Sequence, residues 1–247
     1  MSESLVIAQI AGRDSIAAAV AAVRGRGFTS VLPTIAFTGT ETGDFDAPLR
    51  AVETLRDLLD GSADVLEPVV VTEPELWRAM NACCEMYIQQ RYGVSSPCLA
   101  CHLYLHLLRV PVSWRNGNAP VCSGERDTHD GRIKLSQTTG SIDAATRVLG
   151  YAGVELLEPA RHLSGVEVAA LAGDGWAHGA TQLSCEYSGN YVGPDGSVRY
   201  DEDGYARYLA EFFEPVGLAI VDAWRAERAG GPKTDWHALV RGVLAQA

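Results

Sequence analysis

The sequence has no apolar run long enough to cross a membrane, and no basic stretch, long apolar segment and small-residue cleavage site follow one another at its N-terminus. It also has no excess of basic residues, because 20 Lys and Arg stand against 31 Asp and Glu, a formal net charge of −11. Proteins that bind nucleic acids draw much of their affinity from neutralising phosphates, so this charge disfavours tRNA as a partner. No internal repeat and no low-complexity linker occurs. We therefore expect a cytoplasmic globular protein.

The 247 residues, 47% of them hydrophobic, alternate between strand-like and helix-like segments. We expect strands near 5–10, 30–37, 63–71, 120–123 and 153–159. Helices are expected after Ser15 and over 45–59, 75–92, 103–109, 164–171, 205–228 with a break at Pro215, and 235–247. This order predicts an α/β fold: a Rossmann-like parallel sheet with helices on both faces. We expect a nucleotide-binding domain over 1–190 and a C-terminal helical extension over 191–247.

The junction between the first strand and the first helix is the most informative stretch. An apolar run ends in a turn with Gly12, and Asp14 and Ser15 then supply helix-capping chemistry. A strand, a tight loop and a helix N-terminus present backbone N–H groups and the positive end of a helix dipole, which suit a phosphate. Many α/β domains that bind no phosphate open in the same way, so local physics leaves both interpretations open.

Six cysteines occur, at positions 83, 84, 98, 101, 122 and 185. Without a secretion signal a disulfide framework is not expected. Cys98 and Cys101 have a spacing that lets two thiolates reach one metal or cluster, a pattern shared by zinc, iron–sulfur and redox sites. Cys185 lies in a loop expected at the same edge of the sheet, whereas Cys122 is expected in the core. Unligated thiols remain the alternative.

Residues 10–15 resemble the Ser-Gly-Gly-x-Asp-Ser loop of the PP-loop ATP pyrophosphatases, which activate substrates by adenylation. Gly12, Asp14 and Ser15 match this loop, whereas Ile10 and Ala11 replace its first two residues. The order Cys-x-x-Cys at 98–101 and Cys at 185, with the stretch 158–168 between them, is similar to that of the PP-loop tRNA thiolation enzymes, the 2-thiocytidine and 2-thiouridine synthetases. The resemblance spans about residues 5–190. It implies a 4Fe-4S cluster held by the three cysteines, with one iron left open.

A second branch, the adenylylsulfate reductases, combines a Cys-Cys pair with a Cys-x-x-Cys to fill all four cluster positions. Cys83 and Cys84 form such a pair, but Cys84 precedes Cys98 by too few residues for that family. We therefore expect one of the two to face the core.

The polar segment 124–134 stands where the thiolation enzymes carry Gly-His-x-x-Asp-Asp. Gly124 matches, and Asp127 with Asp130 approximates the acidic pair. The resemblance implies Mg²⁺ held by carboxylates against ATP, with Arg126 and Lys134 stabilising charge on departing pyrophosphate. A solvated loop with ordinary surface charge is the alternative. The implied ATP-binding residues are Ala11, Gly12, Asp14, Ser15, Phe37, Gly124 and Arg126, and the implied catalytic residues are Asp14, Asp127 and Lys134.

These expectations describe an ATP-dependent sulfurtransferase that adenylates a carbonyl oxygen and handles sulfur on a 4Fe-4S cluster. The acidic charge favours a small-molecule or nucleobase substrate over tRNA, and we expect a homodimer. Three alternatives stay open: an ATP pyrophosphatase that forms an amide or nitrile, with zinc-bound or structural cysteines; a cluster-dependent desulfidase; and a non-catalytic nucleotide-binding module. The sequence names neither the substrate nor the sulfur donor.

Overall fold

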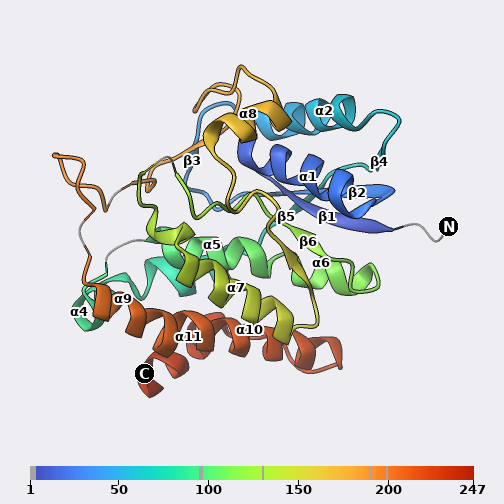
Figure 1. The fold of residues 1–247 in the computed structure, drawn as a ribbon. Helices are drawn as coiled ribbons and strands as arrows, with labels where there is room; N and C mark the ends of the chain where they lie inside the picture. Colours follow the sequence, from blue (N-terminus) through green and yellow to red (C-terminus); the bar gives the residue numbers. More distant parts are fainter. Residues whose placement is uncertain (1–3, 95–96, 130, 190, 199) are drawn as a thin grey trace. The chain divides into compact units, whose positions relative to one another are not determined.

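The computed structural model describes residues 4–94, 97–129, 131–189, 191–198 and 200–247 (Figure 1). Its contacts divide the chain into two units. The first comprises Met1–Thr72, Val112–Ile133 and Val154–Glu186, and the second comprises Glu73–Pro111, Lys134–Gly153 and Tyr187–Ala247. The segment 191–247, expected as a helical extension, therefore falls within a unit that also takes in two earlier stretches of the chain.

The first unit is built on a parallel sheet, which confirms the predicted α/β class. Its strand order is β4-β2-β1-β6-β7, with β5 also pairing with β2, and every pairing is parallel. The strands are β1 (Leu5–Ile10), β2 (Ser30–Ala36), β4 (Asp64–Val65), β5 (Val69–Val71), β6 (Val121–Cys122) and β7 (Leu156–Leu157). The register pairs Leu5 with Ser30 and Val121 with Leu156.

The strand predicted over 63–71 is instead two short strands, β4 and β5. Pro68 lies between them, and because proline has no N–H it cannot donate to a sheet ladder at that point. The apolar run after Pro68 also differs from the expected buried end of a strand, since Val70 is 55% exposed.

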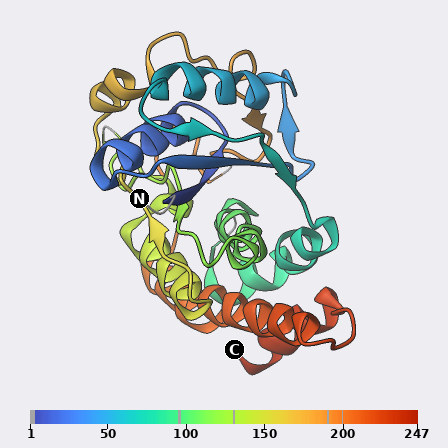
Figure 2. The ribbon, with the colours of Figure 1, turned by 90° about the vertical axis from the view of Figure 1, so that its right-hand side faces the viewer.

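Three helices of the first unit bury the alanine-rich part of the sequence. They are α1 (Arg13–Arg26), α2 (Ala47–Leu59) and α8 (Gly165–Ala172), and α1 packs against both of the others. Figure 2 shows α1 and α2 on the same side of the strands. Ala17, Ala18 and Ala19 are fully buried, and their small side chains let α1 lie close to the sheet. The expected cap of α8 is present: Ser164 and Glu167 form a reciprocal capping box.

The order of the strands creates a topological switch point between β1 and β6. The chain passes from β1 to β2 on one side and from β6 to β7 on the other. In open parallel sheets, ligands bind outside the carboxyl ends of the strands at such a point. The loops that begin at Ala11 and Ser123 therefore flank the expected ligand position. A small antiparallel pair, β3 (Glu41–Thr42) with β8 (Ser184–Cys185), forms a second sheet in this unit.

The second unit is helical, and α10 packs against α7 and α11 while α4 packs against α9. Helix α6 (Val110–Arg115) spans the boundary between the units, and none of the described helices is long and apolar enough to cross a membrane. The other elements are α3 (Pro74–Trp77), a π turn (Arg78–Ala82), α4 (Glu85–Tyr92), α5 (Pro97–Leu107), a 3₁₀ turn (Leu135–Gln137), α7 (Thr139–Tyr151), α9 (Glu202–Tyr208), a second π turn (Leu209–Phe213), α10 (Glu214–Arg228) and α11 (Trp236–Gln246).

Two expectations for the second unit need correction. The stretch 95–102, ahead of the helix expected over 103–109, reads as a turn in the sequence. This is wrong for its described part, because α5 begins at Pro97 and carries both Cys98 and Cys101; Ser95 and Ser96 lie outside the described residues. Proline suits the first position of a helix, where its missing N–H costs nothing. The expected break at Pro215 is a π turn that ends at Phe213, after which Pro215 lies in the first turn of α10.

Candidate functional site

The loop after β1 is organised by the side chain of Ser15. Its Oγ accepts hydrogen bonds from the backbone N–H groups of Ala11 (3.0 Å) and Gly12 (3.1 Å), and it donates to the carbonyl of Gly12 (2.7 Å). Ser15 is buried, whereas Ala11 is exposed. The hydroxyl that the resemblance assigned to ATP binding therefore holds the loop in shape. The next N–H, that of Arg13, donates to Gln182 Oε1 at 3.0 Å.

The loop after β6 lies directly on the start of α1. A Cβ atom at Gly124 would stand 2.5 Å from Ser15 N and 2.7 Å from the carbonyl carbon of Asp14, so only glycine fits here. Beside it, the buried hydroxyl of Ser123 makes no hydrogen bond with any part of the chain that the structure describes. The polar segment that follows the strand predicted over 120–123 thus begins against the loop after β1. An unpaired buried hydroxyl next to two converging loops marks a position suited to a polar ligand.

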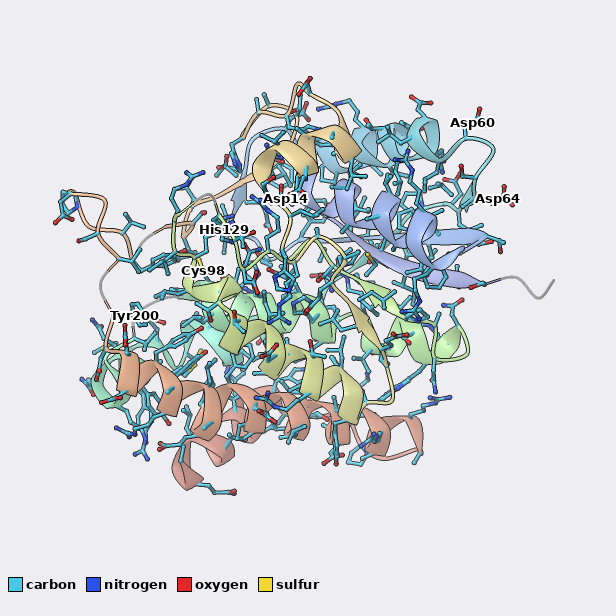
Figure 3. All side chains as sticks on the ribbon, in the orientation of Figure 1. Asp14, Asp60, Asp64, Cys98, His129 and Tyr200 are labelled. Atoms are coloured by element: carbon cyan, nitrogen blue, oxygen red, sulfur yellow. The ribbon has the colours of Figure 1, made fainter. Side chains whose placement is uncertain are left out.

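Arg126 ties the two loops together electrostatically. Its Nε donates to Asp14 Oδ2 at 2.9 Å and its NH1 donates to the carbonyl of Leu163 at 2.9 Å, with the Arg126 side chain only 4% exposed. Asp14 also accepts a hydrogen bond from Arg13 Nε. Figure 3 shows Asp14 at the N-terminal end of α1, with Asp60 and Asp64 at the opposite end of the sheet. Both oxygens of Asp14 are thus engaged by guanidinium groups.

Asp127, like Asp14, is a carboxylate held by ion pairs. Its oxygens accept hydrogen bonds from Arg161 Nε (2.9 Å) and His162 Nδ1 (2.9 Å), and Arg161 also pairs with Glu158. Burial alone raises the pKa of Asp127, but the hydrogen bonds and charges of Arg161 and His162 outweigh it and hold the pKa below its ordinary value. Asp127 therefore stays ionised while it fastens residues 124–128 to residues 158–163.

The loop after β2 gathers its N–H groups around one carboxylate. Glu41 accepts hydrogen bonds from the backbone N–H groups of Thr38, Gly39 and Thr40. Phe37, which the resemblance placed in the nucleotide site, is half-buried and lies 5.9 Å from the Phe45 ring. Neither Glu41 nor Gln182 was singled out by the sequence, and no local pattern around them signals these contacts.

The three candidate cluster ligands have surroundings of the same kind: each side chain is partly exposed and contacts a polar group. Cys98 Sγ donates to the carbonyl of Tyr187 (3.1 Å), and Cys101 Sγ accepts from the indole N–H of Trp77 (3.3 Å). In the first unit, Cys185 Sγ lies 3.3 Å from Thr40 Oγ1. Cys98 and Cys101 belong to the second unit, so convergence of all three stays a prediction. Among the described residues, no three His, Cys, Asp or Glu side chains already form a group suited to a metal.

The other cysteines are set apart from these three. Cys122 is 1% exposed, and burial raises the pKa of its thiol to about 12, as expected for a core residue. Burial likewise raises the pKa of Cys84 to about 12, and its Sγ donates to the carbonyl of Met80. Cys83 is exposed. The expectation that one of the pair at 83–84 faces the core is confirmed.

The structure brings some of the predicted residues together within the first unit. Gly12, Asp14, Ser15, Gly124 and Arg126 meet at the start of α1. Lys134 is exposed and belongs to the second unit, and Asp130 lies outside the described residues. The catalytic and metal-binding roles of these residues stay predictions.

Comparison with known proteins gives one relative and two similar structures. No family model matches the chain. The chain is similar to a 4-thiouridine synthetase solved with RNA and bound ATP (12% identity, TM-score 0.49, 98% of this chain and 53% of that one). It is also similar to the U34-tRNA thiolase NcsA of Methanococcus maripaludis, solved with its 4Fe-4S cluster (11% identity, TM-score 0.42, 100% of this chain and 73% of that one). This chain spans about half the length of the first of these proteins.

The uncharacterized protein MJ0009 of Methanocaldococcus jannaschii is 33% identical to the chain over 221 residues. The match covers 88% of this chain and 79% of that protein. With this identity over most of both sequences, the chain belongs to the same family as MJ0009 of Methanocaldococcus jannaschii.

Proposed function

We propose that the protein is an ATP-dependent sulfurtransferase of the PP-loop type. The observation that carries the proposal is the junction at the switch point, where Gly124 packs on the backbone of Asp14 and Ser15 and the hydroxyl of Ser123 is buried without a described partner. Backbone N–H groups, a helix N-terminus and a guanidinium meet there, and all three favour phosphate oxygens. The match of Gly12, Asp14 and Ser15 to the PP-loop motif names the phosphate as that of ATP.

In this proposal the chain binds ATP against Ala11, Gly12 and Arg126, with Phe37 beside the nucleotide. The substrate's carbonyl oxygen attacks the α-phosphorus, the bond to the β-phosphate oxygen breaks, and pyrophosphate leaves. Arg126 and Lys134 stabilise the charge that develops on it. Asp14 and Asp127 hold the surrounding guanidinium groups in place. Because the oxygens of both carboxylates already accept hydrogen bonds, Mg²⁺ would be held mainly by the phosphate oxygens of ATP.

The donor set suits a 4Fe-4S cluster. Cys98, Cys101 and Cys185 are partly exposed cysteines in polar surroundings, whereas Cys84 and Cys122 are buried. We propose that the first three hold the cluster, which when bound supplies an open iron for sulfur. The indole N–H of Trp77 then donates to the thiolate of Cys101. Attack of sulfur on the activated carbon releases AMP, the leaving group that adenylation created.

We propose a small molecule or a free nucleobase as the substrate. The net charge of −11 gives no long-range attraction to a polyanion such as tRNA. The proposed homodimer would be no more attractive to tRNA, since it carries twice the negative charge of one chain.

Anaerobic purification with iron, sulfide and zinc analysis, followed by an assay for pyrophosphate release, tests the proposal. We expect a brown protein with matching iron and sulfide, and pyrophosphate release that depends on a carbonyl substrate. Cys185→Ala should lose the cluster, and Cys122→Ala, the matched control, should keep it.

A colourless protein that stays so after reconstitution contradicts the cluster, and zinc in its place favours an amide-forming enzyme. Retention of a full cluster in Cys185→Ala contradicts the ligand assignment. Nucleotide binding without pyrophosphate release on any substrate favours a binding module. Loss of sulfur from a thiolated substrate, without its formation, favours a desulfidase.

A further inference from the structure

The backbone N–H groups of the loop after β1 are already occupied by oxygen atoms of the protein. Ser15 Oγ takes those of Ala11 and Gly12, and Gln182 Oε1 takes that of Arg13 from 169 positions away in the sequence. The Gln182 side chain also packs closely against Gly12, because a Cβ atom added at Gly12 would stand 2.2 Å from Gln182 Oε1. A neutral amide oxygen thus occupies the N-terminal end of α1, where an anion is favoured.

The segment that carries Gln182, residues 177–186, is held by few contacts. Its side-chain amide contacts the ring of His178 within the segment, and Gly179 packs on Gly43. Beyond these, the two-residue strand β8 pairs with β3, and Glu186 N donates to the carbonyl of Thr40. Most of the segment is exposed or half-buried. Short, exposed contacts of this kind open with little free energy.

The same segment carries Cys185, three residues after Gln182. Cys185 pairs with Glu41 across the β3–β8 ladder, and its Sγ contacts Thr40 Oγ1 at 3.3 Å. Gln182 and the thiol therefore lie on the same short stretch of chain, so that a contact made by one bears on the position of the other. Both contacts lie within the first unit.

We propose that Gln182 is a positioning residue that couples nucleotide binding to Cys185. Without nucleotide, its amide oxygen occupies the phosphate side of the loop and keeps residues 177–186 docked. A triphosphate takes its place on the N–H of Arg13, and the segment moves, so that Cys185 exchanges its contact with Thr40 for a new position. This inference rests on the proposed ATP site.

The test uses the full chain as purified and the non-hydrolysable analogue α,β-methylene-ATP. Hydrogen exchange should speed up about fivefold for amides of residues 177–186 when the analogue binds, and slow for residues 11–15. Gln182→Ala removes the competitor, so the analogue should bind about tenfold more tightly and exchange in 177–186 should be fast from the start. Gln90→Ala, an exposed glutamine on α4, is the matched control and should change neither measurement.

Gln182→Glu supplies a second variant that keeps the acceptor oxygen and adds a negative charge. It should weaken binding of the analogue about tenfold, because the carboxylate occupies the anion position more strongly and repels the triphosphate. Wild-type protein that binds the analogue with unchanged exchange in 177–186, and with equal affinity in both variants, would overturn the coupling while leaving the ATP site intact. Wild-type protein that binds no analogue would overturn the ATP site and the coupling together.

Discussion

Two segments contact the loop after β1, and they are held in opposite ways. Residues 124–128 lie on the backbone of α1 and are fixed by the buried side chain of Arg126 and by the ion pairs of Asp127. Residues 177–186 touch the same loop through the side chain of Gln182. Apart from this contact, the two-residue strand β8 pairs them with β3, in the segment that follows β2. In the coupling proposed for Gln182, residues 124–128 stay in place and residues 177–186 move.

Gly124→Ala should have the largest effect, because its new Cβ atom meets backbone atoms of Asp14 and Ser15 that have no room to give. We expect a loss of about 3 kcal/mol in the free energy of unfolding, measured by chemical denaturation, together with weaker ATP binding. Gly25→Ala is the control, since nothing lies within 4 Å of its Cβ position in α1; it should stabilise by about 0.5 kcal/mol. If Gly124→Ala were as stable as the wild-type protein, the close contact at Gly124 would not be what fixes residues 124–128.

Arg126→Met should follow. It removes the hydrogen bonds to Asp14 Oδ2 and to the carbonyl of Leu163 from a side chain that is 4% exposed. We expect a loss of about 2 kcal/mol in unfolding free energy. Arg24→Met, at an exposed position of α1, should change it by less than about 0.5 kcal/mol. Equal effects of the two substitutions would show that the ion pair does not fasten the fixed segment.

The contribution of Asp127 should depend on pH. Its pKa is lowered in the folded chain, so the unfolded chain binds more protons in acid, and the stabilisation present above the unfolded pKa is lost as pH falls through the folded pKa. Denaturation followed from pH 7 downward should therefore show a fall below about pH 4 that is smaller in Asp127→Asn. Asp60→Asn, an exposed control at the far end of the sheet, should leave the wild-type profile unchanged.

Thr40→Val should have the smallest effect, since among the described side chains its hydroxyl contacts only Cys185 Sγ and Thr38 Oγ1. It removes the hydroxyl next to Cys185 Sγ while keeping the branched shape. Unfolding free energy should change by less than about 0.5 kcal/mol, and hydrogen exchange at 184–186 should rise about twofold. Thr54→Val on α2 serves as the control. Slower exchange at 184–186 would contradict the view that these contacts hold the segment docked.

The framework of the first unit was predictable because its signals are local. The apolar run before Gly12, the capping residues at Ser164 and Glu167, and the apolar spacing over Ala47–Leu59 each specify their own element. The predictions failed where local signals compete. Pro68 separates β4 from β5 within a stretch that reads as one strand, and Pro97 starts a helix in a stretch that reads as a turn. No prediction covered α7, although Thr138 caps it and apolar residues recur along it.

The site was predictable only in its motif-bearing half. Gly12, Asp14 and Ser15 stand together in the sequence, and Gly124 follows a strand. The contact of Gln182 with Arg13 joins residues 169 positions apart, and nothing near either residue specifies the other. The same holds for Trp77 and Cys101, whose hydrogen bond depends on how α3 and α5 pack.

The π turn at Arg78–Ala82 acts as a phase shift in the helical segment around it. One extra residue in a turn rotates everything after it by about 100° relative to a regular α-helix. Trp77, before the turn, donates to Cys101, and Tyr92, after it, packs edge-on against Tyr208. Deleting one residue from the turn would rotate α4 relative to α3 by a similar angle, so Trp77 and Tyr92 would not both keep their present partners.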